Sequence, residues 1–171
     1  ISSVIAFRPY ARQRFMTFLN PTADSQGAGY QIQQSLIAIG SGQLNGRGFG
    51  QSVQKFNYLP EPIGDSIFAV QAEEFGLIGS ISLVLLFLLF LFRSVKIAAR
   101  STDSFGGLTV IGIAILITVE SFMNISSMIG ILPLAGMPLL FVSHGGTALL
   151  MALFSIGIML SVARERKVGV R

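Results

Sequence analysis

An aspartate at position 65 lies between a polar, glycine-rich stretch of the chain and a long apolar one. A carboxylate at such a border meets both water and lipid, so it can contact a polar head group whose tail stays in the bilayer. Loss of water around Asp65 would raise its pKa, which suits a general base. Asp65 also follows Gly64 and precedes an apolar segment, where an aspartate often caps a helix N-terminus. The sequence is compatible with both roles, and one residue can serve in both.

Three further carboxylates lie in or beside apolar stretches: Glu73, Glu74 and Glu120. Acidic side chains at membrane depth are costly and are interpreted as functional by default. We therefore predict that these glutamates shape a polar, substrate-binding cavity. The alternative for Glu73 and Glu74 is an ion pair with an arginine such as Arg47, or contact with interfacial water. The alternative for Glu120 is a hydrogen bond to Ser121 or Asn124.

Five basic residues precede Asp65: Arg8, Arg12, Arg14, Arg47 and Lys55. Such side chains can hold a pyrophosphate through charge-assisted hydrogen bonds, or contact anionic lipid head groups. We assign the first three to lipid head groups. Arg47 and Lys55 flank the glycine run and the Asp65 segment, so we assign them to the substrate. Gln54 and Glu61, in the same segment, are included as substrate-binding candidates.

Ser143 and His144 precede the third apolar stretch, where Gly145 and Gly146 allow close helix packing. We include Ser143 among the substrate-binding candidates and interpret His144 as a polar interfacial residue rather than a base. The chain has one histidine and no cysteine. This composition argues against a histidine-rich metal site and leaves no disulfide or thiol chemistry.

Three apolar stretches must position these side chains: 75–92, 105–132 and 145–162. The first and third each hold 18 residues without a charge, which is about 27 Å of helix at 1.5 Å per residue. A helix of that length can span a bilayer core of about 30 Å. We predict three membrane-spanning helices. The apolar segment around Pro133 and Pro138 is broken by its prolines, so we expect a re-entrant or interfacial turn there.

The basic residues also predict an orientation. The short segment 93–104 carries three of them, the end of the chain four, and the connection between the second and third spans none. The positive-inside rule places the first two in the cytoplasm and residues 1–65 outside, together with the turn at 130–144. Within the outer part we expect a basic interfacial helix over 8–15 and an amphipathic one over 30–40. The glycine run over 40–50 would let backbone approach a ligand closely.

The composition supports a membrane protein. Hydrophobic residues make up 51% and charged residues 12% of the 171 residues, against about 25% charged in soluble domains. The mean hydropathy is +0.69. The chain begins with Ile1, so we expect it to be the C-terminal part of a longer protein. The predicted fold is an all-α, polytopic membrane bundle, with an extracytoplasmic loop over 1–65 and the last three spans and a cytoplasmic tail over 66–171.

Several segments together resemble the SEDS family, which comprises FtsW, RodA and SpoVE. The resemblance runs in order through nearly the whole chain. It is carried by Asp24 to Gln31, Gln34 to Gly42, Gly46 to Lys55, Tyr58 to Asp65, Glu73 to Gly79, Asn124, Gly130 to Pro133, Gly136 to Leu139 and Ser143 to Gly146. The chain departs from the family pattern at Gln43, at Ile63-Gly64 in place of His-Thr, at Leu140 in place of proline and at His144 in place of tyrosine. The departure at Ile63-Gly64 bears on the hydrogen bonding of Asp65.

The resemblance implies a multi-spanning glycosyltransferase of the bacterial plasma membrane that polymerises lipid II with a class B penicillin-binding protein and other division proteins. The family's essential aspartate corresponds to Asp65, on the outer side. Asp65 would take a proton from the GlcNAc 4-hydroxyl as it attacks the MurNAc anomeric carbon, and undecaprenyl pyrophosphate would leave. Arg47 and Lys55, with a divalent cation such as Mg²⁺ or Mn²⁺, would hold the pyrophosphate. No nucleic acid is expected.

Two alternatives to this enzymatic role are kept. A lipid II flippase or transporter would use the intramembrane glutamates as its moving parts, with Asp65 as a cap. A non-enzymatic scaffold would hold a penicillin-binding protein and its division partners without a site of its own.

Overall fold

The computed structural model describes residues 14–18 and 27–165, and every regular element in that part of the chain is helical. This confirms the predicted all-α class. A short helical segment covers 14–18. The longer elements are α3 (Ala28–Ser41), α4 (Gln54–Asn57), α5 (Ile67–Ala98), α6 (Ser104–Met128) and α7 (Gly146–Glu165).

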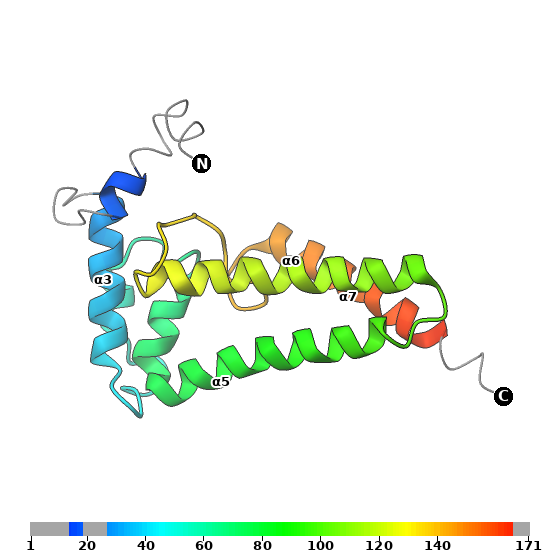
Figure 1. Cartoon of the computed structure of the whole chain (residues 1–171). Helices are drawn as coiled ribbons and strands as arrows, with labels where there is room; N and C mark the ends of the chain where they lie inside the picture. The colour runs from blue at the N-terminus through cyan, green and yellow to red at the C-terminus, as the bar shows by residue number, and fades with distance from the viewer. Residues whose placement is uncertain (1–13, 19–26, 166–171) are drawn as a thin grey trace.

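Three of these helices, α5, α6 and α7, are long and apolar enough to cross a membrane. Figure 1 shows α5 and α6 lying side by side along the length of the molecule, with α7 beyond α6. Buried serines on these helices donate to their own helix, as Ser121 does to the Ile117 carbonyl at 2.8 Å. Satisfying hydroxyls internally is what a water-free bilayer requires. The chain is a multi-pass membrane protein.

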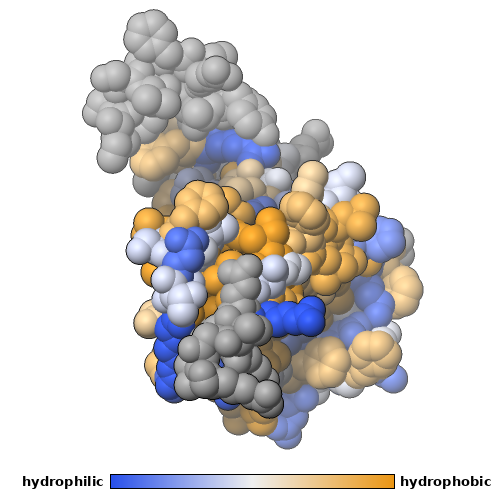
Figure 2. All heavy atoms as spheres, turned by 90° about the vertical axis from the view of Figure 1, so that its right-hand side faces the viewer, coloured by the Kyte–Doolittle hydropathy of each residue, from blue (hydrophilic) through white to orange (hydrophobic). Residues whose placement is uncertain are grey.

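The end of α5 and the turn to α6 carry the basic residues that set the predicted orientation. Arg93, Lys96 and Arg100 are all exposed. Figure 2 looks onto this end of the bundle and shows hydrophilic residues here, with hydrophobic residues covering the helices around them. Asp103 begins α6 as its N-cap, and its carboxylate accepts from Gly106 N at 2.9 Å. The side of the membrane on which this turn lies stays a prediction.

Helix α5 is broken at Gly76, which has a φ of 66° and a ψ of −162° inside an otherwise helical run. Residues 67–75 lie against α3, and only the part after Gly76 runs along α6 (Figure 1). Residues 77–98 provide roughly 33 Å of helix, enough for one crossing. The helix that follows the Asp65 loop, Ile67–Ala98, is thus apolar and long enough to span a membrane, and it is kinked at Gly76.

The glycine-rich loop 42–48 fills the break in α5. Arg47 N and Gly48 N donate to the Glu73 and Glu74 carbonyls, each at 3.0 Å, and Leu77 N donates to the Gln43 carbonyl at 2.9 Å. These bonds satisfy backbone groups that the broken helix would leave unpaired.

The close packing of this loop against the α5 backbone explains why it contains glycines. A Cβ at Gly42 would lie 2.0 Å from the Ala72 carbonyl oxygen, and one at Gly46 would lie 2.1 Å from that of Glu74. At these two positions the close approach that we predicted for a ligand is made to the chain's own backbone.

Helix α3 crosses one end of the bundle and confirms the amphipathic helix predicted over 30–40. Its buried Ala38 packs with Ala69 and Val70 of the first α5 segment. Its buried Ile32 joins a second cluster that includes Phe68 of α5 and Met128 of α6. The core therefore ties the loop region to the spans. The predicted basic helix over 8–15 lies outside the described residues apart from its last two positions, which are helical.

The connection between α6 and α7 has no regular helix over 129–145, which confirms the predicted proline-broken turn. Gly130 and Gly136 adopt φ values of 74° and 65° in it. The buried Leu134 and Leu139 anchor the connection in the same core as Met128. The turn thus folds back over the end of α6 and passes close to Asp65.

Candidate functional site: a polar cavity at Asp65

Asp65 lies in a tight turn immediately before α5. Gly64 N and Ser66 N both donate to the Glu61 carbonyl, at 3.1 and 3.2 Å, and the Ser66 hydroxyl donates to the Pro60 carbonyl at 2.9 Å. The N-cap of α5 is Ser66, and no side chain caps it. The alternative in which Asp65 is a helix cap was therefore wrong, and its carboxylate is left for other contacts.

Two other segments hold this turn in place through its backbone. The Ser143 hydroxyl donates to the Gly64 carbonyl at 2.7 Å, and His144 N donates to the Ile63 carbonyl at 2.9 Å. From α6, Asn124 Nδ2 donates to the Asp65 carbonyl at 2.8 Å. The departures at Ile63 and Gly64 do not disturb these bonds, because only main-chain oxygens accept them.

A small polar cavity lies next to the Asp65 carboxylate. Its volume is about 40 Å³, which is room for roughly one to three water-sized groups. A single hydroxyl can enter such a space and a sugar ring cannot. The segment 14–18, α3, α6 and the α6–α7 connection all contribute to the lining, which consists of Arg14, Gln31, Asp65, Asn124, Ser127, Met128, Leu134, Gly136 and Met137.

Arg14 belongs to this cavity, although the sequence interpretation assigned it to lipid head groups. Its Nη1 donates to the Leu134 carbonyl at 2.6 Å. A Cβ on Gly136 would lie 3.4 Å from Arg14 Nη1 and 3.7 Å from Asp65 Oδ2, so the guanidinium and the carboxylate flank the same glycine. No local pattern marks this pairing, because Arg14 and Leu134 are 120 positions apart.

Gln31, Asn124 and Ser127 are the other polar residues of the lining that sequence reasoning did not place at Asp65. Gln31 Nε2 donates to the Ser66 hydroxyl at 2.9 Å, which links α3 to the start of α5. A signal for Asn124 did exist, since a polar amide inside an apolar helix is costly for the same reason as Glu120. We considered it as a partner for Glu120 and as one of the residues that carry the family resemblance, and not as a neighbour of Asp65.

The electrostatics of the site favour a protonatable Asp65. Burial raises the pKa of Asp65 above its ordinary 3.8, the nearby negative charge of Glu61 raises it further, and the positive charge of Arg14 lowers it in part. Glu61 itself is exposed. A carboxylate of raised pKa that is still partly exposed is a reasonable proton acceptor.

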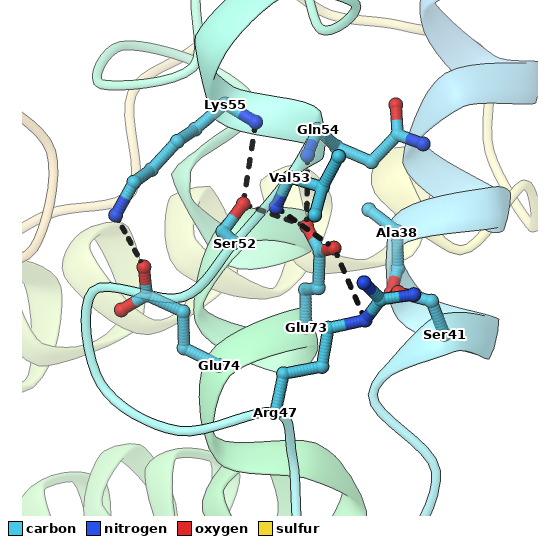
Figure 3. A network of polar contacts seen from close by, with 9 residues as sticks. All are labelled: Ala38, Ser41, Arg47, Ser52, Val53, Gln54, Lys55, Glu73 and Glu74. Carbon is cyan, nitrogen blue, oxygen red and sulfur yellow. Dashed lines mark hydrogen bonds and ion pairs between the residues drawn. The ribbon is translucent and has the colours of Figure 1, made fainter.

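Glu73 and Glu74 form a separate polar network at the break in α5 (Figure 3). Glu73 is fully buried. Its carboxylate accepts from the Ser52 hydroxyl at 2.6 Å, from Val53 N at 3.1 Å and from Gln54 N at 3.3 Å. Arg47 Nε lies 3.5 Å from Glu73 Oε1, which confirms the ion pair proposed as the alternative.

Lys55 completes this network by pairing with Glu74, with 2.6 Å between Nζ and Oε1 (Figure 3). The two bases assigned to a pyrophosphate are thus each neutralised by a glutamate. The Arg47 side chain is still 44% exposed, and its anion-binding role stays a prediction. None of these four residues lines the Asp65 cavity.

Two further candidates, Glu120 and Gln54, do not line the Asp65 cavity. Glu120 is partly exposed on α6, and the predicted hydrogen bond to Ser121 or Asn124 is absent, because both donate to carbonyls instead. Glu120 does not line the cavity either. Gln54 Oε1 is buried and has no partner in the described part of the chain. His144 is exposed.

A metal centre finds little support in the side chains that the structure describes. Over 14–18 and 27–165 no group of three or more His, Cys, Asp or Glu residues could hold an ion. The predicted divalent cation therefore stays a prediction.

Comparisons with known proteins identify relatives of this chain. Residues 1–168 match the family model of FtsW, RodA and SpoVE, described as cell cycle protein. Stage V sporulation protein E of Bacillus subtilis (strain 168) is 44% identical over 156 residues, which are 91% of this chain and 43% of that protein. The peptidoglycan glycosyltransferase MrdB of Escherichia coli (strain K12) is 45% identical over 159 residues, which are 92% of this chain and 43% of that protein.

Two further matches agree with these. A probable peptidoglycan glycosyltransferase FtsW of Thioalkalivibrio sp. (strain K90mix) is 45% identical over 163 residues, 94% of this chain and 41% of that protein. A chain solved in work on the structural coordination of polymerization and crosslinking by a peptidoglycan synthase complex has a TM-score of 0.73 at 25% identity, over 94% of this chain and 44% of that chain. The chain spans about two fifths of the length of the curated relatives it matches. It belongs to the FtsW, RodA and SpoVE family of cell cycle proteins, the SEDS family.

Proposed function

We propose that this chain carries the reaction centre of a peptidoglycan glycosyltransferase that polymerises lipid II, for division or for cell shape, with Asp65 as general base. The observation that supports this most directly is a partly buried carboxylate of raised pKa beside a cavity of hydroxyl size. Relatives named peptidoglycan glycosyltransferase support the reaction class. The site would face the outer side of the plasma membrane.

The proposed step is one inverting displacement. The 4-hydroxyl of the acceptor GlcNAc attacks the anomeric carbon of the donor MurNAc, and Asp65 takes the hydroxyl proton. The new carbon–oxygen bond forms as the bond from the anomeric carbon to the pyrophosphate oxygen breaks. Undecaprenyl pyrophosphate leaves with that electron pair. An aspartate whose pKa is raised by burial holds the proton better than a solvated one.

The leaving pyrophosphate needs positive charge, because negative charge grows on it during transfer. We assign this role to Arg47 and Lys55, which would turn from Glu73 and Glu74 toward the phosphates. Arg14 supplies a third positive charge beside Asp65. The proposed step uses no divalent cation, because the described residues contain no group of three or more His, Cys, Asp or Glu side chains that could hold one.

The proposed partner is a class B penicillin-binding protein, with other division proteins. The similar solved chain comes from a complex described as coordinating polymerization and crosslinking. Crosslinking is a second chemistry that the described site does not provide, so a partner would supply it.

A transporter of lipid II is the second candidate. Glu120 favours it, because an intramembrane carboxylate without an ion pair in the described residues is costly to keep without a function. In that case Glu120→Gln would impair the protein and Asp65→Asn would not.

Asp65→Asn in the full-length protein, purified with its penicillin-binding partner and given labelled lipid II, tests the proposal. We expect no glycan chains from this variant. Asp103→Asn is a matched control, because it changes an aspartate at the opposite end of the bundle and keeps a good N-cap. It should polymerise like the wild type. Equal products from Asp65→Asn and wild type would remove Asp65 as the base.

A further inference from the structure

The glycine-rich loop is attached to the part of α5 that begins the membrane crossing. Leu77 N donates to the Gln43 carbonyl at 2.9 Å, and Ile78 N donates to the Leu44 carbonyl at 3.3 Å. Figure 1 shows this loop at the corner where α3 ends and α5 bends. The two bonds fix the loop at the level at which α5 starts its crossing.

Two large apolar side chains of this loop are exposed where the loop meets α5. Leu44 is 63% exposed and Phe49 is 84% exposed. The Phe49 ring lies 6.0 Å from the ring of Phe75, measured between their centroids. Phe75 and Ile78 are exposed in turn on the surface of α5. Leu44 and Phe49 therefore extend the apolar surface of α5 onto the loop.

The exposed apolar surface of α5 begins at this same level. Before the break, residues 68–70 and 72–74 are buried in the protein. From the break onward, large apolar side chains are exposed on successive turns, at Leu77, Ile78, Ile81 and Leu85. A continuous exposed apolar surface on a span is the surface that contacts lipid. The loop thus lies where the protein-covered part of α5 gives way to the part that lipid can cover.

The polar side chains of the loop limit how deep it can lie. Gln43, Asn45 and Arg47 are all exposed. Such side chains are costly in the hydrocarbon core, but they are well tolerated among lipid head groups, where a long basic side chain can reach water. The loop therefore suits the interface, at a depth where its apolar side chains reach the acyl chains.

We propose that residues 42–50 are inserted into the bilayer leaflet at this end of α5, with Leu44 and Phe49 among the acyl chains. Lipid is the occupant of this surface, because the surface is continuous with that of a membrane-spanning helix. Insertion places Arg47 at the depth of the lipid phosphates, which attract a basic side chain. The insertion does not depend on the proposed function, although it sets Arg47 at the level of a lipid-linked pyrophosphate.

Tryptophan fluorescence in vesicles tests the insertion, because the chain itself contains no tryptophan. Phe49→Trp is made in the full-length protein, with any tryptophan elsewhere in it replaced by phenylalanine. The protein is reconstituted in phosphatidylcholine vesicles with or without brominated acyl chains, which quench tryptophans within their reach. Ile78→Trp is the positive control on α5. Phe56→Trp is the matched control, since Phe56 is also a highly exposed aromatic residue of the loop region, and its ring lies 5.2 Å from the Lys55 Nζ.

We expect brominated lipid to reduce the emission of Phe49→Trp as strongly as that of Ile78→Trp, and to leave the emission of Phe56→Trp unchanged. The emission maximum of Phe49→Trp should lie at a shorter wavelength than that of Phe56→Trp, because its surroundings are less polar. Both results should hold with and without the penicillin-binding partner.

The proposal is overturned if Phe49→Trp is quenched no more than Phe56→Trp. It is also overturned if adding the penicillin-binding partner abolishes the quenching of Phe49→Trp, since a protein surface would then cover the loop. If Phe49→Trp does not fold, Leu44→Trp is the probe, with the same expected result. Failure of the proposed function is recognised separately, because the quenching needs no lipid II and the Asp65→Asn experiment needs no tryptophan.

Discussion

Replacing Glu73 with glutamine should detach the loop around residues 52–54 from α5. Glu73 is fully buried, and its two carboxylate oxygens accept three hydrogen bonds from Ser52, Val53 and Gln54. A glutamine has only one accepting oxygen, so either orientation turns an NH₂ group toward a donor on the other side. The substitution changes no shape, so its cost comes from hydrogen bonding and charge.

The size of the effect can be worked out from these contacts. Hydrogen bonds to a charged group contribute about 1.5–3 kcal/mol each. At least one bond is lost, while the Ser52 hydroxyl can rotate to accept from the new amide. The Arg47 pair adds little, because that side chain is 44% exposed and its Nε lies 3.5 Å away. We expect a loss of about 2–4 kcal/mol in the stability of the loop.

Hydrogen exchange of the Val53 and Gln54 amides, with the protein in detergent micelles, measures this loss. Exchange in Glu73→Gln should accelerate by roughly 30-fold or more, from the conversion of about 1.4 kcal/mol per factor of ten. Glu61→Gln serves as the control, since an exposed carboxylate substitution changes stability by less than about 0.5 kcal/mol. Protection of both amides at the wild-type level in Glu73→Gln would refute the reasoning that Glu73 holds the loop.

Two further predictions follow from the same geometry. Gly46→Ala should lower the thermal unfolding midpoint by several degrees, because its Cβ would lie 2.1 Å from the Glu74 carbonyl oxygen at a φ of 76°. Gly40→Ala is the control and should leave the midpoint unchanged or raise it, because a Cβ there meets nothing within 4 Å. Equal midpoints for the two variants would contradict the described packing of the loop 42–48. Glu61→Gln should lower the pKa of Asp65, because a negative charge that raises it is removed. A base works deprotonated, so turnover is lost as pH falls through that pKa, and the acid limb of polymerisation should move to lower pH; an unmoved or rising limb would exclude Glu61 as a cause.

Much of the architecture is predictable because it depends on the hydropathy and spacing of residues that are close together in the sequence. The three apolar stretches and the periodic apolar residues over 30–40 each became a helix, since hydropathy and helical spacing are local properties. The proline-broken turn after α6 followed from Pro133 and Pro138. Asp65 was identified by its place between polar and apolar sequence. The break in α5 was missed, because glycines are common in membrane helices and Gly76 resembles Gly79 in the sequence.

Side-chain partners were harder to predict. The pairing of Arg47 with Glu73 was predicted as an alternative, because a charged group near an apolar boundary is stabilised by a partner of opposite charge. The assignment of Arg14 to lipid failed, because its distance to Asp65 depends on how the segment 14–18 packs against the α6–α7 connection. Glu120 was expected to bond to its helix neighbours, which in fact donate to backbone carbonyls.

The sequence alone therefore determined the membrane class, the helical elements and the aspartate between the polar and apolar parts of the chain, because each depends on residue types counted along a short stretch. Only the tertiary structure decided which groups meet Asp65. Asn124 is 59 positions away from Asp65, and Ser143 is 79 positions from Gly64. Such contacts arise where α3, the start of α5, the end of α6 and the turn after it pack on one another, and the free energy that selects this packing is shared among residues far apart in the chain.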